Sequence, residues 1–226
     1  EAGPYLAWHA ALDRPDSVTP EPPPQPRPPL AARPRRLSVT QIESWMRDPY
    51  SIYARHVLGL SALEPLDAEP GAADRGMLIH DALDRFVASH PAGLPGDALD
   101  RLLAIGRDCF GAALARPSIW AFWWPRFERI AAWFIAREMA RRGGLAACLS
   151  EVAGELAIAA PGGRFTVTAR ADRIERRADG ALVLVDYKTG TLPKPKDIEL
   201  GFAPQLPLEA AIAMAGGFKG LAPAVM

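Results

Sequence analysis

Residues 164–190 read RFTVTARADRIERRADGALVLVDYKTG, and this stretch decides the fold. Apolar and β-branched residues alternate with charged ones on both sides of a glycine, a pattern typical of two antiparallel strands joined by a tight turn. Ala178, Asp179 and Gly180 fit a three-residue hairpin loop with glycine in the left-handed conformation. Residues whose numbers sum to about 358 should therefore face each other across this hairpin.

Asp172 and Asp186 satisfy this register, so they are expected to lie opposite each other on adjacent strands. Like charges in that position destabilise a strand pair unless something compensates them, and a bound cation is the natural compensation. Side chains alternate along a strand, so Lys188 should share the face of Asp186 while Tyr187 points to the other face.

Two carboxylates and one lysine on a single face suit the hydrolysis of a phosphodiester. The carboxylates of Asp172 and Asp186 would hold Mg²⁺ or Mn²⁺, which prefer oxygen ligands. The metal would polarise the scissile phosphate and lower the pKa of a bound water. Lys188 would orient that water or stabilise the charge that develops on the phosphoryl oxygens.

A structural alternative exists for each aspartate. Asp172 could pair with Arg170 or Arg173 on a solvated strand, and Asp186 could begin a turn. The functional interpretation is favoured because Asp186 follows the apolar run of residues 181–185, where a carboxylate at a buried strand end is costly without a partner.

The residues before this hairpin are expected to be mainly helical. Thr40 and Glu43 match a capping box, and Asp48 with Pro49 matches the start of a second helix that ends at Gly59. Apolar residues at helical spacing then predict three further helices, over residues 75–89, 99–114 and 120–142.

After these helices the pattern changes to a period of two. It predicts three strands, over residues 151–159, 164–176 and 181–187, and a last helix from Phe202 that is closed by Gly216 and Gly217. The expected fold class is α+β, a small sheet flanked by helices, with a mainly helical N-terminal half.

Composition narrows the class of protein. The chain has 226 residues, 49% hydrophobic and 23% charged, which is typical of a globular protein with one core. No apolar run approaches the roughly 20 residues that span a bilayer and no signal pattern opens the chain, so we expect no membrane partner and a cytoplasmic location. The 26 basic and 26 acidic residues cancel, so contact with nucleic acid must come from local patches.

The organisation of the chain is also indicated by its composition. Prolines are concentrated in residues 15–36 and favour an extended linker over packed structure. We expect residues 1–36 to be an upstream remnant and linker, and residues 37–226 to be the folded domain of a chain that was once longer. The two cysteines, Cys109 and Cys148, are too few for a disulfide framework and are expected to be buried.

The motifs ADRIE and LVLVDYKTG resemble the RecB-like branch of the PD-(D/E)XK nucleases, whose core is restriction-endonuclease-like with a small mixed sheet. That family has an upstream G-x-x-x-H element, which Gly76 and His80 supply. The resemblance implies that His80 binds the metal beside Asp172 and Asp186, and that the main-chain carbonyl of Tyr187 completes the metal shell.

Two further positions follow from the resemblance. Gln205 matches a glutamine that the family places near the DNA and the catalytic Lys188, although Glu209 stands where tyrosine is usual. The family often has an acidic residue in the first core strand, and Glu155 is a better match than Glu151. Glu155 would bind the metal or support a ligand through water, or it is only a solvent-facing residue.

Within this branch, residues 37–220 most resemble the C-terminal nuclease domain of the AddB subunit of bacterial helicase-nucleases. This implies an exonuclease that cuts single-stranded DNA during double-strand break resection and recombinational repair, beside an AddA-type helicase-nuclease subunit. Many relatives have an iron-sulfur cysteine where this chain has Asp48, so no cluster is expected. Two alternatives stay open: a catalytically silent scaffold that binds DNA or a helicase subunit, and a free-standing Cas4-like exonuclease.

Basic and aromatic groups elsewhere in the sequence are assigned as follows. The candidates for a DNA track are the arginines beside Asp172, namely Arg173, Arg176 and Arg177. A second basic set at helical spacing is interpreted as a solvated helix face, namely Arg137, Arg141 and Arg142. The tryptophans are assigned to the helical core, namely Trp120, Trp123, Trp124 and Trp133.

Overall fold

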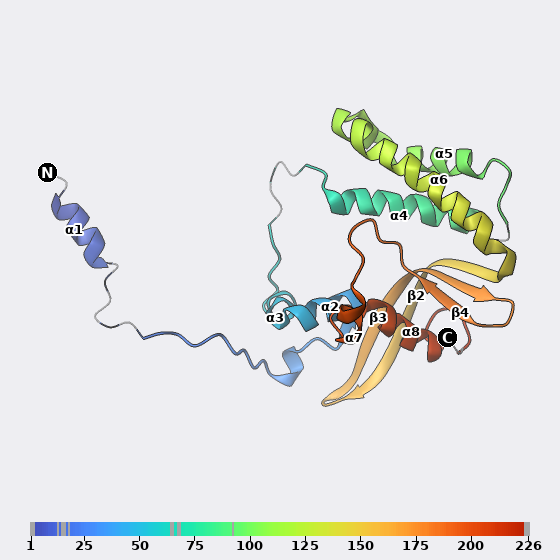
Figure 1. Ribbon diagram of the computed structural model, residues 1–226. Coiled ribbons are helices and arrows are strands. Elements are labelled where there is room, and N and C mark those ends of the chain that lie inside the picture. The colour runs from blue at the N-terminus through green and yellow to red at the C-terminus, as the bar shows by residue number, and fades with distance from the viewer. Residues whose placement is uncertain are drawn as a thin grey trace.

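Two long antiparallel strands form the centre of the computed structural model, β2 (Leu145–Ala160) and β3 (Gly163–Arg177). One edge of β3 pairs with β2 along its length. The other edge pairs first with the short parallel strand β1 (Arg36–Ser38) and then with the antiparallel strand β4 (Leu182–Val185). The sheet is therefore mixed and has four strands in the part of the chain that the structure describes (Figure 1).

The structure describes residues 3–12, 14, 17, 19–63, 66, 69–91 and 93–223. Pro15, Asp16 and Val18 of the expected linker and the last three residues of the expected domain lie outside these ranges. Residues 19–27 are exposed and have neither helix nor strand, as the prolines predict. Before them, the helix α1 (Gly3–Leu12), which the sequence did not predict, buries none of its residues and lies apart from the sheet (Figure 1).

The helix α2 (Val39–Arg47) begins two residues earlier than the predicted N-cap at Thr40 implied, because the observed N-cap is Ser38. Its capping box is formed by Ser38 and Gln41, so the expected pair Thr40 and Glu43 was wrong. Ser38 is the last residue of β1, and its extended backbone places the hydroxyl over the first turn, where it accepts from the Gln41 main-chain N–H at 3.1 Å. The predicted cap of α3 (Pro49–His56) is confirmed, because Asp48 accepts from the Tyr50 N–H.

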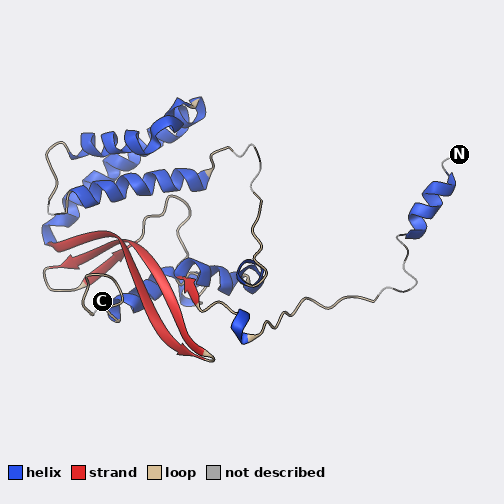
Figure 2. Ribbon diagram, turned by 180° about the vertical axis from the view of Figure 1, so that it is seen from behind, coloured by secondary structure: helices blue, strands red, loops and turns tan. Residues whose placement is uncertain are grey.

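Three helices form a layer above one end of the sheet: α4 (Ala72–Ser89), α5 (Ala98–Phe110) and α6 (Trp124–Arg141) (Figures 1 and 2). A 3₁₀ segment (Gly111–Ala115) and a π-helical segment (Ile119–Trp123) connect α5 to α6. Their shared core contains Phe86, Phe110 and Phe127, and Cys148 of β2 joins it from the sheet. Cys148 is buried as expected, whereas Cys109 is only half-buried.

The remaining helices, α7 (Pro195–Glu199) and α8 (Gln205–Met214), follow the sheet. Ile212 and Ala213 of α8 pack on Val167 and Ala171 of β3, which forms a second core. The sequence predicted α8 but not α7. The expected α+β class, a small mixed sheet flanked by helices, is confirmed. Within the described residues, no helix is both long and apolar enough to cross a bilayer.

The β3–β4 hairpin has the register that the sequence predicted. Four residue pairs, from Arg176 and Leu182 to Arg173 and Val185, follow the same sum, and Gly180 adopts a φ of 88° in the turn. The three predicted strands differ in length from their prediction: β2 begins six residues earlier, β3 is one residue longer at each end, and β4 ends at Val185 rather than Tyr187. The pairing thus stops where the polar residues begin.

Candidate functional site

The hairpin places Asp172 and Asp186 at its open end. The ladder stops at Arg173 and Val185, so the two aspartates occupy the next pair of positions. The Tyr187 main-chain N–H donates to Oδ2 of Asp172 at 2.8 Å, which keeps the chain beside β3 after the ladder ends. Burial raises the pKa of Asp172, and the nearby charge of Asp186 raises it further, whereas the N–H of Tyr187 and the charge of His80 lower it.

The predicted alternative partners of Asp172 are engaged elsewhere. Arg170 forms an ion pair with Glu151, and Arg173 is buried against Glu138 and Glu175. Asp172 instead accepts a hydrogen bond from the Tyr187 main-chain N–H and lies beside His80.

Lys188 shares the face of Asp186, as the alternation predicted. Its Nζ lies 2.8 Å from Asp186 Oδ2 and donates to Gln205 Oε1 at 2.9 Å. The Gln205 amide nitrogen in turn donates to Asp186 Oδ1 at 2.9 Å. These three side chains close a ring of polar contacts, in which the lysine is about a third exposed and the aspartate is almost buried. The lysine therefore has one side free toward solvent.

His80 reaches this site from α4. Its Nδ1 lies 3.6 Å from Asp172 Oδ2, and its ring packs edge-on to Tyr187. Gly76, one turn earlier, allows the approach: a Cβ there would lie 3.2 Å from the Thr189 hydroxyl in the loop after β4. The G-x-x-x-H element thus packs α4 against that loop. The two segments are far apart in the sequence, so no local pattern specifies this contact.

The acidic residue that the first core strand brings to the site is Glu151, so the preference for Glu155 was wrong. The pairs on either side of it place Glu151 opposite Asp172, and it has a φ of 51°, which a non-glycine residue rarely adopts. Burial raises the pKa of Glu151, and Arg170 and His80 oppose the rise. Glu155 lies four residues further along β2, about 60% exposed, and binds Arg36 at 3.0 Å. The sequence signal that could have identified Glu151 is the tight turn after Ala160, because this turn sets the β2–β3 register.

Glu209 lies directly behind the polar ring. It is 2% exposed, and its Oε1 accepts from the Gln205 amide nitrogen at 3.2 Å. Burial raises the pKa of Glu209 to about 7, against the hydrogen bond from Gln205, and the charges of Asp186 and Asp172 add to the rise. The amide of Gln205 is therefore held with its nitrogen toward two carboxyl groups and its oxygen toward Lys188.

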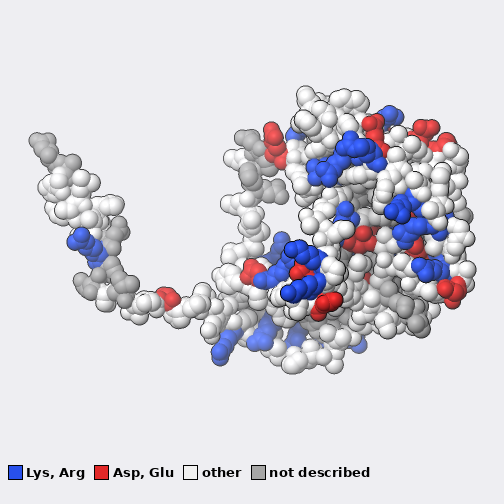
Figure 3. Space-filling view, viewed as in Figure 1, with Lys and Arg blue, Asp and Glu red and all other residues white. Residues whose placement is uncertain are grey.

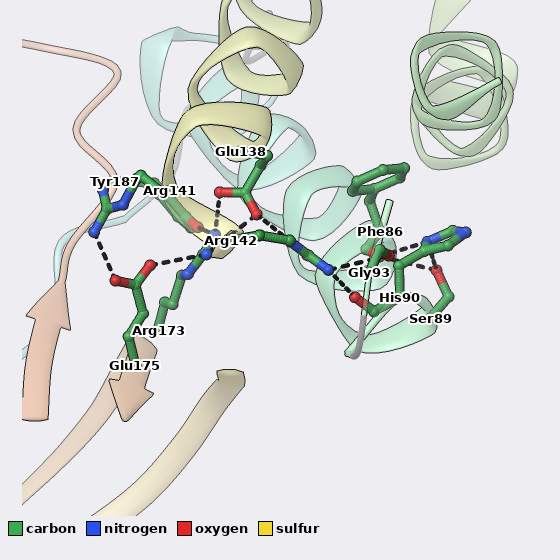
Figure 4. A network of polar contacts seen from close by, with 10 residues as sticks. All are labelled: Phe86, Ser89, His90, Gly93, Glu138, Arg141, Arg142, Arg173, Glu175 and Tyr187. Atoms are coloured by element: carbon green, nitrogen blue, oxygen red, sulfur yellow. Dashed lines mark hydrogen bonds and ion pairs between the residues drawn. The ribbon is translucent and has the colours of Figure 1, made fainter. Parts of the chain in front are cut away.

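The residues next to the two aspartates point to the opposite face, into a buried ion network. Arg173 binds Glu138 of α6 at 2.6 Å and Glu175 at 2.8 Å, and it donates to the Tyr187 hydroxyl at 3.1 Å (Figure 4). The assignment of Arg173 to a DNA track was therefore wrong, because the residue is 1% exposed. Arg176 and Arg177 are exposed, but they lie at the turn end of the hairpin.

The network also involves the end of α6. Arg141 donates to Glu175 and Arg142 to Glu138, each at 2.8 Å (Figure 4). Of the set interpreted as a solvated face, only Arg137 and Arg141 are exposed. The tryptophan assignment was right for Trp124, which is buried, and wrong for Trp120 and Trp133, which are more than half exposed.

The donor set suits a hard divalent cation. Asp172, Asp186 and His80 converge, and burial disfavours the charge of Asp172 in the absence of a cation. Among the described residues, no group of three or more His, Cys, Asp or Glu side chains has the close spacing of a preformed metal site. Binding of a cation there would require the Lys188 to Asp186 ion pair to rearrange.

Two hollows meet at this site. A cleft of about 580 Å³ runs between α6 and the loop after β4, and it is lined by Trp133, Arg137, Asp186 and Lys188 among others. A second hollow lies on the far side of Asp186 and Lys188, toward α2 and Gln205. In Figure 3 basic and acidic side chains gather around the hollow between the helical layer and the rest of the domain.

Residues 36–225 match the family described as the PD-(D/E)XK nuclease superfamily. The chain is also similar to uncharacterized proteins of Rickettsia. It is 32% identical to one from Rickettsia bellii (strain RML369-C) over 82% of this chain and 22% of that protein. It is 31% identical to protein RC0550 of Rickettsia conorii (strain ATCC VR-613 / Malish 7) over 82% of this chain and 23% of that protein. The chain thus spans less than a quarter of the length of these relatives.

Proposed function

The chain belongs to the PD-(D/E)XK nuclease superfamily, and we propose that it is a DNA nuclease domain that depends on Mg²⁺ or Mn²⁺. The observation that carries the proposal is the convergence of Asp172, Asp186 and Lys188 on one face at the open end of the hairpin, with His80 and Gln205 beside them. A fold alone does not specify an activity, whereas this set of side chains suits phosphodiester hydrolysis.

The proposed ligands are His80, Asp172, Asp186 and the main-chain carbonyl of Tyr187. Glu151, which lies opposite Asp172, replaces Glu155 as the acidic residue of the first strand and is proposed to support this set. When bound, the divalent ion would polarise the scissile phosphate and lower the pKa of a water.

Lys188 and Gln205 are proposed to act on the substrate side. The Lys188 ammonium has one side exposed, where it can stabilise the negative charge that develops on the phosphoryl oxygens or orient the attacking water. Gln205 fixes the position of Lys188 through its Oε1. A side chain that is already held in place loses little entropy when the phosphate arrives, which favours catalysis.

The cellular role is proposed on narrower grounds. The motifs resemble the AddB nuclease domain, which supports an exonuclease for single-stranded DNA in break resection and recombination, with an AddA-type partner subunit and a cytoplasmic location. The family match begins at residue 36, which supports a boundary between residues 1–36 and 37–226. The greater length of the relatives supports a part of a larger protein over a free-standing Cas4-like exonuclease.

The test is metal binding and cleavage in matched variants. Asp172→Ala/Asp186→Ala should abolish both Mn²⁺ binding, measured by titration calorimetry, and the cutting of labelled single-stranded DNA. Glu155→Ala is the control, because this exposed acidic residue is held by Arg36 outside the site. If the wild type bound Mn²⁺ without cutting, or bound none, the catalytic proposal would fail and the scaffold alternative would be favoured.

A further inference from the structure

The helix α6 carries a row of exposed basic residues interrupted by one tryptophan. Its members follow each other at intervals of three or four positions, which places them on one face of the helix. We call this row the α6 stripe: Arg126, Arg129, Trp133, Arg137 and Arg141. The buried residues of α6 are apolar except for Glu138 and pack in the helical core, so the stripe lies on the exposed side of the helix.

Most of the charge in the stripe is uncompensated. Among the described residues, Arg126, Arg129 and Arg137 take part in no ion pair, whereas Arg141 binds Glu175 at 2.8 Å. The chain as a whole has a net charge of zero, so this face is a local concentration of positive charge on a protein that is neutral overall. A solvated face of a helix more often mixes both signs. Glu128, the acidic residue nearest to Arg126 and Arg129 in the sequence, accepts a hydrogen bond from the Trp124 ring nitrogen instead.

The stripe leads into the proposed active site. Arg126, Arg129 and Trp133 line a shallow hollow on the surface of α6. Trp133, Arg137 and Arg141 line the cleft that also contains Asp186 and Lys188. Trp133 lines both hollows, is 59% exposed, and has the Arg137 guanidinium over its ring at 5.8 Å. The path is therefore continuous from the far end of α6 to the carboxylates.

We propose that the α6 stripe binds the single strand of DNA that enters the active site, with its arginines on phosphates and Trp133 stacked on an unpaired base. At 1.5 Å per residue, Arg126 and Arg141 are about 22 Å apart along the helix. This length suits about six nucleotides of a stacked strand at roughly 3.4 Å each. Base stacking on an exposed ring requires bases that are not paired, which favours a single strand over a duplex.

The inference rests on the proposed function, but its test does not require cleavage. Binding of a fluorescein-labelled 12-nucleotide oligo(dT) is measured by anisotropy in EDTA, at salt concentrations from 50 to 200 mM. Arg126→Gln/Arg129→Gln/Arg137→Gln should reduce the slope of log affinity against log salt by about two, since each phosphate contact to a single strand contributes about 0.7. Trp133→Leu should weaken binding by about 5- to 150-fold and leave the slope unchanged.

The matched control removes the same charge elsewhere. Arg27→Gln/Arg33→Gln/Arg164→Gln changes three exposed arginines, two in the linker before β1 and one beside the β2–β3 turn, and it should leave the slope within about 0.5 of the wild type. All the substituted residues are exposed, and thermal melting followed by circular dichroism checks that each variant is folded.

The outcomes separate the two proposals. An unchanged slope in the stripe variant, an equal loss in the control, or no binding by the wild type would each overturn the stripe, and the first would point to an acidic protein partner instead. A stripe-dependent slope in a protein that does not cut DNA would keep the stripe and refute the nuclease. If cleavage depended on Asp186 and the stripe variant had the same salt slope as the wild type, the nuclease proposal would stand and the stripe proposal would be refuted.

Discussion

Replacing Glu209 by glutamine should stabilise the metal-free protein at neutral and alkaline pH. Glu209 is buried behind Gln205, and burial raises its pKa to about 7 from an ordinary value of 4.5. Between these two values the folded protein keeps a proton that the unfolded chain releases. Stability therefore falls as the pH rises through this window, and it stays low above it.

The size of the effect follows from the difference in proton affinity. Each tenfold change is worth about 1.4 kcal/mol, so the full difference would correspond to roughly 3 kcal/mol. Part of this loss of stability is already present at pH 5, and solvent at the open side of the site screens the charge of Glu209. We therefore expect the free energy of unfolding to fall by about 2 kcal/mol between pH 5 and pH 8 because of Glu209. Glutamine has nearly the same shape, keeps an oxygen for the Gln205 amide, and carries no charge.

The assay is urea unfolding at pH 5, 6, 7 and 8 in EDTA, for the wild type and Glu209→Gln. The stability difference in favour of the variant should grow by about 2 kcal/mol over this range. Burial also raises the pKa of Asp172, but that residue is the same in both proteins, so the comparison removes its contribution. Glu155→Gln, which changes an exposed acid, should show no such growth. Parallel curves for wild type and Glu209→Gln would refute the argument.

Three further substitutions test contacts that stabilise the fold. Glu138→Leu should lower the unfolding free energy by about 3 kcal/mol in urea, because it leaves the buried Arg173 with one acidic partner fewer. Ser38→Ala should cost about 1 kcal/mol through the lost helix cap, and equal costs for Ser38→Ala and Thr40→Ala would contradict the capping box. Gly106→Ala should lower the melting temperature, at a cost of about 1 to 3 kcal/mol, because the new methyl group would overlap the Phe127 ring.

The part of the site that lies on the β3–β4 hairpin could be predicted from the sequence. The alternation on both sides of Gly180 specified the β3–β4 register, and with it the positions of Asp172, Asp186 and Lys188. Turn chemistry and a period of two act over a few residues, so they can be seen in one sequence. The approach of His80 and Gln205 depends on packing between distant segments, and the family resemblance supplied it.

What sequence reasoning missed depended on tertiary contacts. Arg173 was assigned to a DNA track because it flanks Asp172. Alternation from Asp172 turns it to the inner face, where Glu138 comes from a helix more than 30 positions away. Glu155 was preferred to Glu151 by motif, whereas the β2–β3 register decides which acid faces Asp172. The strand β1 has only three residues, too few for any alternation to be recognised.

The buried ion network joins the helical layer to the sheet, so neither layer of this domain can be removed without breaking it. Sheet, α2 and α8 have a core of their own, so residues 72–144 could be mistaken for a removable insertion. A chain shortened in that way would leave Arg173 and Glu175 without Glu138, Arg141 and Arg142, and would expose their desolvated surface to water. Engineering of a smaller version of this domain would have to keep α4 with His80, and to replace the network with apolar residues before another helix is deleted.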